Sequence, residues 1–418
     1  MIRRSRRSSG CQVVTEVIPG ARSVALGVMV AAGSRFESPG QQGASHLLEH
    51  LLFRGSAGRD GRAIADLLDR LGGDSNAYTD KEMMTAYVRT LPERTADALA
   101  LLASVITSPT LEHEAVDSEL AVVADEILAR DDEPADLAAS AFEELCFPGH
   151  PLGRDVLGTL ETLELLDVDL LASFHRSTYG TSRMAVVAVG AVDHDAICDL
   201  TDELISARPA DLLARSDPPR PTSGARVVEQ PGSQAHLVIG MPLGGLDARE
   251  RSTLGVLSHL LGGGVSSRLF REVREERGLA YGVGTELSFY AGAGSISAYA
   301  ASAPLNMAEV IHLIERAFAD VGNGGVTDVE VDRSGEALRT DLLLSADEPL
   351  TRLGRLGADA LVHDAVIETA HRIEVLESVT VDDVRAMAAR ILEGPTVATL
   401  VGPIDPDAVA ALDRVVGR

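Results

Sequence analysis

The 418-residue chain is poor in cysteine and in long apolar runs, which argues against a disulfide-stabilised fold and against a membrane span. The three cysteines, Cys11, Cys146 and Cys198, are far apart and odd in number, which is typical of packing residues in a reducing compartment rather than of a disulfide framework. No apolar run approaches the ~18–20 residues of a membrane span, and no signal-peptide cleavage site is apparent. We therefore expect a cytoplasmic protein without a membrane segment.

Positive charge is also scarce. The 37 lysines and arginines face 63 aspartates and glutamates, giving a formal net charge of −26, and Lys81 is the single lysine. Such an acidic surface argues against nucleic acid and anionic membranes as partners, and it suits basic peptides. The length is sufficient for two domains with full cores.

The most informative stretch is SHLLEH at 45–50, in which two histidines and a glutamate follow the order H-x-x-E-H. On a helix, His46 and His50 lie one turn apart with Cβ atoms ~5–6 Å from each other, so both imidazoles can bind one metal ion. Glu49 stands beside them, and the order of the three residues is a zinc-peptidase signature. An ordinary amphipathic helix that carries two histidines is the alternative.

A catalytic zinc site takes three protein ligands, and a helix predicted over 112–131 offers two carboxylates. Glu119 and Glu126 are seven residues apart, which places both on one helix face. Glu126 is therefore a candidate third ligand, and Glu119 is a candidate for orienting a ligand histidine through a hydrogen bond. A solvated acidic face explains the same spacing, so the pattern alone leaves both interpretations open.

Local patterns predict a chain of strands and helices. Strands are expected at 12–18, 23–32, 76–79, 84–88 and 184–189, and helices from Ala44 or Ser45 and at 61–71, 93–107, 112–131 and 167–178. Pro19-Gly20 predicts a hairpin between the first two strands. Residues 206–225 contain four prolines and little apolar periodicity, which is typical of an interdomain linker.

The second half of the chain repeats the first. Matching dipeptides recur 212 residues apart, namely Pro19-Gly20 with Pro231-Gly232 and Val189-Gly190 with Val401-Gly402. SHLLGG at 258–263 matches SHLLEH at 45–50, so the second copy lacks the glutamate and the second histidine. We infer an internal duplication with a zinc-binding catalytic domain at 1–205 and a homologous domain without a zinc site at 226–418.

These features together resemble the M16 (pitrilysin/insulinase) metallopeptidases, in the smaller subfamily that includes the mitochondrial processing peptidase. The resemblance spans nearly the whole chain. Besides the H-x-x-E-H it rests on GSRFE at 33–37, on 43–55, on GGDSNA at 72–77, and on 119–126, 150–151 and 262–282. In the family the third zinc ligand is a glutamate at the place of Glu126, and Glu119 matches a second family carboxylate.

The resemblance implies an α+β fold of two similar domains, each a mostly antiparallel sheet with helices packed on one face, and one Zn²⁺ per subunit. It implies that Glu49 is the general base and that Arg274 and Tyr281 stabilise the oxyanion of the substrate. An arginine-rich helix that ends at a buried tyrosine is the alternative for this pair. The substrate would add as an extended strand to the sheet edge at Asn76 and Ala77.

The resemblance further implies two subunits that close like a clamp, with the Arg274 and Tyr281 of one subunit at the zinc of the other. A homodimer is sufficient, and a heterodimer with a related subunit is possible. The predicted function is a zinc endopeptidase that cuts short or unfolded polypeptides. A non-catalytic subunit that binds peptides or scaffolds an active partner is one alternative, and a maturation protease for one dedicated peptide is another.

Overall fold

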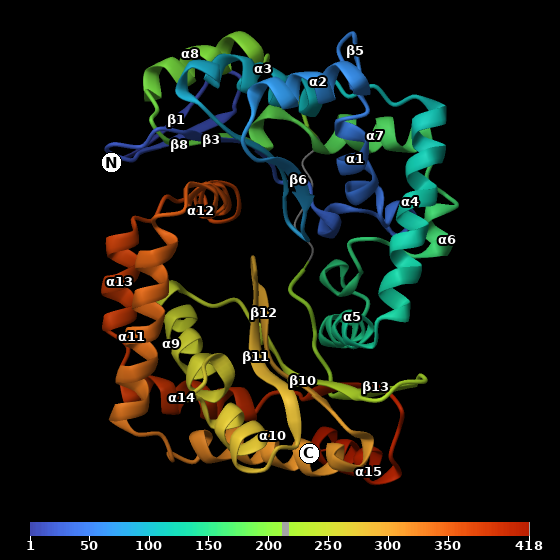
Figure 1. Ribbon diagram of the computed structural model, residues 1–418, viewed down its shortest axis with the longest axis vertical. Coiled ribbons are helices and arrows are strands. Elements are labelled where there is room, and N and C mark those ends of the chain that lie inside the picture. Colours follow the sequence, from blue (N-terminus) through green and yellow to red (C-terminus); the bar gives the residue numbers. More distant parts are fainter. Residues whose placement is uncertain (211–216, 418) are drawn as a thin grey trace. The chain divides into compact units, whose positions relative to one another are not determined.

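The computed structural model describes residues 1–210 and 217–417, which fold into two compact units (Figure 1). The first unit consists of Met1–Ile127, Arg154–Arg215 and Leu344–Glu368, and the second of Leu128–Gly153, Ser216–Leu343 and Thr369–Arg418. None of the described helices combines the length and apolar character that crossing a membrane requires.

The first unit is built on a six-stranded sheet in the order β1-β2-β8-β3-β7-β6. Its strands are β1 (Ile2–Arg6), β2 (Gln12–Val17), β3 (Val24–Val30), β6 (Ser75–Thr79), β7 (Met84–Thr90) and β8 (Met184–Gly190). Only the β2–β8 pair is parallel, so the sheet is mostly antiparallel as predicted. β3 and β8 are buried along their whole length, because helices cover both faces of the sheet.

The predicted hairpin between β2 and β3 is wrong. The chain does turn at Gly20, whose φ is +79°. However, β8 lies between the two strands, parallel to β2 and antiparallel to β3. The strand that separates β2 from β3 therefore comes from a segment more than 150 residues downstream, which a local turn signal does not reveal.

Helices from the first half of the chain pack on one face of this sheet. They are α1 (Ala44–Leu52), α2 (Gly61–Leu71), α3 (Thr95–Thr107), α4 (His113–Asp132), α7 (Val168–Thr178) and α8 (His194–Leu204). The other face is covered by α12 (Pro349–Val362), whose Leu353 and Leu356 pack on Met29 and Val187. The expected helices at 61–71, 93–107, 112–131 and 167–178 are confirmed within two residues at each end.

The second unit has a five-stranded sheet in the order β11-β12-β10-β13-β9. Its strands are β9 (Gly224–Glu229), β10 (Ala235–Gly244), β11 (Ala280–Tyr290), β12 (Ala293–Ser302) and β13 (Val397–Gly402). The main helices on one face are α9 (Ala248–Ser258), α10 (Met307–Gly322), α11 (Asp328–Ser345), α13 (Thr369–Glu377), α14 (Val381–Leu392) and α15 (Pro406–Val416). α5 (Pro134–Cys146) packs on the opposite face.

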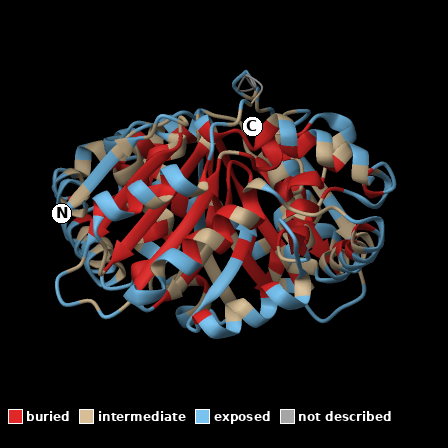
Figure 2. Cartoon of the chain, turned by 90° about the horizontal axis from the view of Figure 1, so that it is seen from above, coloured by how far each residue is buried: buried red, intermediate tan, exposed pale blue. Residues whose placement is uncertain are grey.

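The structure confirms the internal duplication. Counted from the parallel pair, β2-β8-β3-β7-β6 in the first sheet matches β9-β13-β10-β12-β11 in the second, and β1 is an additional edge strand of the first. β2 and β9 begin 212 residues apart, as do α8 and α15. α5 and α12 are also equivalent, since each follows the sequence Asp-Glu and begins with a proline. Buried residues run through the central strands (Figure 2), namely β3 and β8 in the first copy and β10, β12 and β13 in the second, whereas the edge strands are partly exposed.

One helix of each half belongs to the core of the other. α5 comes from the first half and packs on the sheet of the second unit, whereas α12 comes from the second half and packs on the sheet of the first. The compact units are therefore interleaved in sequence, while the predicted domains 1–205 and 226–418 follow the two copies of the duplication. Of the predicted linker, residues 211–216 lie outside the described residues.

Candidate metal centre

The metal-site motif lies on α1, and the sequence folds there as a helix with one wholly apolar face. Four leucines, at 47, 48, 51 and 52, are fully buried in the core of the first unit. The opposite face carries His46, Glu49 and His50, which are partly exposed. The helix begins at Ala44, as predicted.

The structure brings the two histidines together with the carboxylate of Glu126 on α4. The Nε2 atoms of His46 and His50 each lie 3.8 Å from a carboxylate oxygen of Glu126. One ligand atom from each residue can be chosen so that all three lie within 4.8 Å of one another, and no second group of this kind occurs in the described part of the chain. Zinc binds nitrogen and oxygen at ~2.0–2.2 Å, so this cluster can bind a metal ion.

The electrostatic state of His46 fits a metal ligand. Burial, and then the neighbouring His50, lower the pKa of His46 to about 4. The imidazole is therefore neutral at pH 7, which is the form that binds a metal.

Glu119, two turns before Glu126 on α4, contacts a histidine of the cluster rather than the metal position. Its buried carboxylate accepts a hydrogen bond from Nδ1 of His50 at 3.0 Å, which leaves Nε2 of that ring directed to Glu126. The second oxygen of Glu119 accepts from Nε of Arg54 at 2.5 Å. Glu119 is thus not part of a solvated face. Arg54 was not singled out from the sequence, although its position four residues after His50 is a usable signal.

Glu49 lies between the metal cluster and the edge of the sheet. Burial raises the pKa of Glu49 above its usual value, while Thr79 at the end of β6 acts in the opposite direction. A carboxylate whose pKa lies closer to neutrality is better matched to proton transfer at neutral pH.

β6, which carries Asn76 and Ala77, is the last strand in the order of its sheet. In the described residues it pairs only with β7, so its other edge has backbone groups without a strand partner. Asn76 is exposed, whereas Ala77 faces the core. Because α1 packs beside β6, the metal cluster and this free edge belong to one unit.

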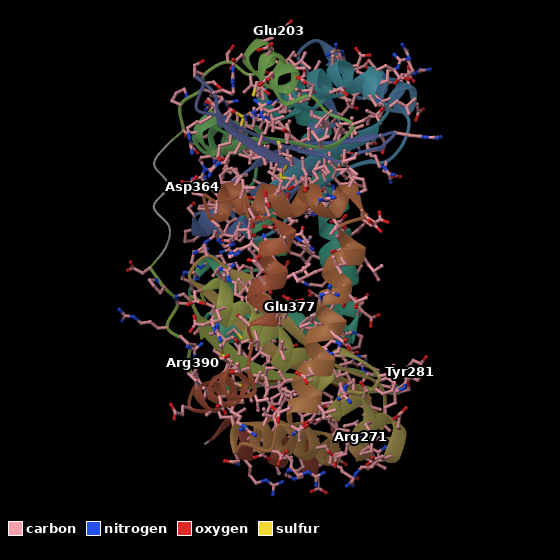
Figure 3. All side chains as sticks on the ribbon, turned by 90° about the vertical axis from the view of Figure 1, so that its left-hand side faces the viewer. Glu203, Arg271, Tyr281, Asp364, Glu377 and Arg390 are labelled. Atoms are coloured by element: carbon pink, nitrogen blue, oxygen red, sulfur yellow. The ribbon has the colours of Figure 1, made fainter. Side chains whose placement is uncertain are left out.

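Arg274 and Tyr281 lie in the second unit and are brought together there. Arg274 is on the π-helical segment η7 (Phe270–Glu276), and its guanidinium lies 4.5 Å from the ring centre of Tyr281 and 4.7 Å from that of Phe270. Tyr281 is 78% exposed and projects at the surface (Figure 3). The alternative of a buried tyrosine is therefore wrong.

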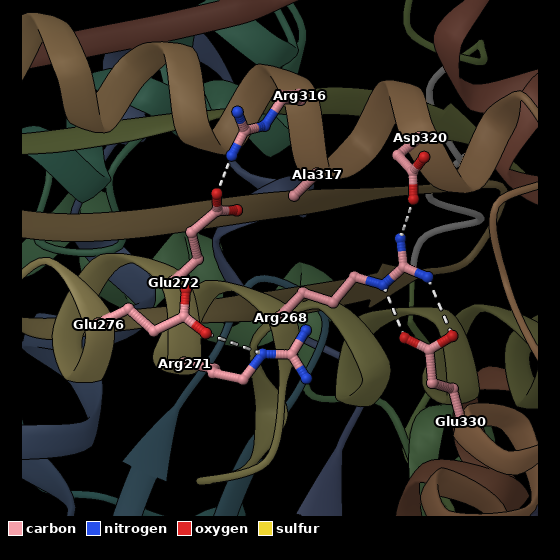
Figure 4. A pocket seen from close by; sticks show the side chains of 8 residues that line it. All are labelled: Arg268, Arg271, Glu272, Glu276, Arg316, Ala317, Asp320 and Glu330. Carbon is pink, nitrogen blue, oxygen red and sulfur yellow. Dashed lines mark hydrogen bonds and ion pairs between the residues drawn. The ribbon is translucent and has the colours of Figure 1, made fainter.

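A charged pocket of about 370 Å³ lies behind η7 (Figure 4). In it Arg268 bonds both Asp320 on α10 and Glu330 on α11, and Arg316 on α10 pairs with Glu272. Each of these charged side chains has its ion-pair partner within the pocket, so the pocket anchors η7 to the helices behind it.

The second copy of the motif has no room for a side chain in place of Glu49. Gly262 and Gly263 stand where the first copy has Glu49 and His50. A Cβ atom on Gly262 would lie 2.6 Å from the backbone nitrogen of Thr285. The close approach of η6 (His259–Gly263) to β11 thus requires glycine.

Comparison with known proteins places the chain in a family. Residues 12–160 match the model described as Insulinase (Peptidase family M16), and residues 166–338 match that described as Peptidase M16 inactive domain. An uncharacterized zinc protease of Mycobacterium leprae is 36% identical over 96% of this chain and 91% of its own length. The chain belongs to the M16 peptidase family. A second relative, an uncharacterized zinc protease of Bacillus subtilis, is 30% identical over 96% of this chain and 98% of its own length.

Solved structures share the fold of this M16 chain. A peptidase M16 inactive domain from Pseudomonas fluorescens aligns with a TM-score of 0.89 at 22% identity, covering 97% of this chain and 98% of that one. A protease from Helicobacter pylori aligns with a TM-score of 0.89 at 21% identity, covering 96% and 99%. The predicted α+β fold of two similar domains is confirmed.

Proposed function

We propose that this M16 chain is a zinc endopeptidase that hydrolyses short or unfolded polypeptides bound in extended form. The proposal rests on the convergence of His46, His50 and Glu126 beside Glu49 on one face of α1. The names of the relatives, zinc proteases, support the choice of zinc and of peptide-bond hydrolysis. One Zn²⁺ per chain follows from the single cluster in the described residues.

Each residue has a distinct task in this proposal. Zinc, when bound, would supply a Lewis acid that polarises the scissile carbonyl and acidifies a water molecule. Glu49 accepts a proton from the attacking water and passes it to the leaving amine. Glu119 keeps the proton of His50 on Nδ1, so that Nε2 is free to bind the metal. The free edge of β6 pairs with the extended substrate backbone.

The oxyanion is assigned to Arg274 and Tyr281 of a second subunit in a homodimeric clamp, or of a related subunit in a heterodimer. A guanidinium that lies 4.5 Å from the ring centre of an exposed phenol suits that task, since both groups can donate hydrogen bonds to an oxyanion. We place the enzyme in the cytoplasm, which the buried, free Cys11, Cys146 and Cys198 support.

A non-catalytic peptide-binding or scaffold subunit is the rival proposal. It is less well supported because this chain retains His46, Glu49, His50 and Glu126 together. A maturation protease for one dedicated peptide uses the same chemistry and differs only in substrate range.

The test compares wild type with Glu49→Gln for zinc content and for cleavage of a quenched library of unfolded peptides. We expect about one zinc per chain in both proteins and cleavage only by wild type. Glu114→Gln, an exposed change on α4, is the matched control and should cleave as wild type does. A folded wild-type protein without zinc contradicts the proposal. Zinc without cleavage of any library member favours the scaffold or the dedicated protease.

A further inference from the structure

Four charged side chains near the metal helix are buried although none of them is a metal ligand. Arg35, Glu37, Lys81 and Glu82 are between 4% and 9% exposed. With the half-buried Arg154 they form what we call the buried charged cluster. It lies between the first turn of α1 and the turn that follows β6, both in the first unit.

Glu37 caps the N-terminus of α1 from outside the helix, because the residue at the capping position has no side chain. The residue before the helix, Gly43, has a φ of +91° and no side chain to cap it. The two carboxylate oxygens of Glu37 accept hydrogen bonds from the backbone N–H of Ser45 at 2.7 Å and of Gly43 at 3.1 Å. A negative charge at this end is favoured by the helix dipole, and the bonds satisfy N–H groups that have no partner within the helix.

The cap bears on His46, whose Nδ1 atom lacks the kind of hydrogen bond that holds His50. Nδ1 of His50 is held by Glu119, but Nδ1 of His46 is buried and has no hydrogen-bond partner among the described residues. His46 is the third residue of α1, so the direction of its ring depends on the backbone of the first turn. That turn is the part of the helix that Glu37 holds.

The segment with Glu37 is also joined to the turn that follows β6. The backbone N–H groups of Ser34 and Arg35 donate to the carbonyls of Asp80 at 3.2 Å and Lys81 at 2.8 Å. Contact is so close that a Cβ atom on Gly33 would lie 2.3 Å from the Asp80 carbonyl oxygen. The side chain of Arg35 adds an ion pair with Glu82 that is almost completely buried.

Arg154 and Lys81 add a second link between the Glu37 segment and the turn that follows β6. Nη1 of Arg154 donates to the carbonyl of Glu37 at 2.8 Å, and Nζ of Lys81 donates to the carbonyl of Arg154 at 2.6 Å. The first turn of α1 and the end of β6 are therefore held by one network of buried hydrogen bonds.

We propose that Glu37 is a positioning residue, which fixes His46 relative to the end of β6 through the buried charged cluster. The inference rests on the proposed function, because it concerns the helix that would bind zinc. It adds a residue outside the H-x-x-E-H stretch that sets the geometry of the site. Burial raises the pKa of Glu37 to about 7, so keeping a charge there costs stability, as expected for a group retained to place another one.

The experiment compares zinc affinity, measured by competition with a chromophoric chelator, and hydrogen exchange at the first turn of α1. In Glu37→Gln the side chain keeps its size but has one acceptor oxygen for two N–H donors. We expect roughly 10-fold weaker zinc binding, in the range known for residues that orient metal ligands. Exchange at Gly43 and Ser45 should be faster than in wild type, while exchange at the C-terminal end of α1 is unchanged.

Glu16→Gln is the matched control, since Glu16 is a buried glutamate of the same unit that bonds Arg352 and no part of α1. It should lower stability but bind zinc as wild type does. Equal zinc affinity in Glu37→Gln and wild type overturns the proposal, and so does an equal loss in both variants. If Glu37→Gln does not fold, Arg154→Gln replaces it and should weaken zinc binding in the same direction.

The outcomes separate this proposal from the proposed catalysis. A wild-type protein that binds zinc but cuts no peptide contradicts the catalysis alone, and the comparison of zinc affinities remains decisive for Glu37. A wild-type protein that binds no zinc overturns both.

Discussion

His46 and His50 stand one turn apart on the same helix, yet they are held by different means. The ring of His50 is fixed by a direct hydrogen bond to Glu119, and Glu119 in turn is held by Arg54. Nδ1 of His46 has no such partner among the described residues, and the support that we propose for its ring is the backbone that Glu37 caps. The sequence pattern shows the two histidines as equals, because spacing specifies which side chains share a face but not what holds each of them.

Glu37 should also make the stability of the protein depend on pH. Its pKa is raised from 4.5 to about 7 in the folded chain, so the folded state binds a proton that the unfolded state has already lost. The stabilisation by this proton is fully present below pH 4.5 and is lost as the pH rises through 7. The stability of wild type relative to Glu37→Gln should therefore fall by up to about 3 kcal/mol over this window.

Urea unfolding of both proteins without metal at about pH 5 and about pH 8 measures this difference. Groups other than Glu37 titrate alike in the two proteins and cancel. A difference that is constant, or that grows with pH, contradicts the raised pKa.

At the scale of elements, the sequence specified the local structure well and the pairing poorly. The start of α1 and the end of α2 agree with the prediction. In α1 buried leucines recur at helical spacing, and α2 ends before Gly72, whose φ is +66°. β1 was not predicted, since its arginines obscure the strand pattern. The partner of β2 could not be inferred either, because β8 is specified only by contacts distant in sequence.

The same limit applied to the candidate site. The spacing within H-x-x-E-H predicted one face of a helix, and the structure brings these residues to Glu126. The spacing of Glu119 and Glu126 left a solvated face equally acceptable, and the resemblance to a family was needed to choose. Glu37 lies in the GSRFE stretch of the resemblance, but neither it nor Arg154 showed a structural role, since their partners are backbone groups, which every residue has.

The contact between the Gly33 segment and the turn after β6 predicts a steric effect. Gly33→Ala places a methyl group 2.3 Å from the Asp80 carbonyl oxygen, so one of the two segments must move. We expect a loss of about 1–3 kcal/mol in the free energy of unfolding, measured by denaturant titration. Gly40→Ala is the control, because a Cβ atom there meets no atom within 4 Å. Equal stability of the two variants contradicts the close packing.

At the scale of the whole molecule, the proposed clamp predicts complementation between two inactive variants. Glu49→Gln lacks the base and Tyr281→Phe lacks the oxyanion donor, so each should be inactive or nearly so alone. In a mixed dimer one site combines Glu49 of one subunit with Tyr281 of the other. Equimolar mixing with subunit exchange should then restore about a quarter of wild-type activity, because half of the dimers are mixed and each has one intact site.

Peptide cleavage before and after mixing measures this effect, with each variant mixed with Glu49→Gln/Tyr281→Phe as the control. No recovery, in a sample whose subunits have exchanged, contradicts a site composed of two subunits.

The exchange of α5 and α12 between the two copies bears on how the protein is made. A ribosome that has released only the first half has delivered every strand of the first sheet, but not the helix that covers the face with Met29 and Val187. That face stays open to water until α12, which ends at Val362, has left the ribosome, well over a hundred residues after the last strand of the sheet. Folding of the first unit therefore depends on synthesis of the second copy, because its sheet is covered on both faces only after α12 has been made.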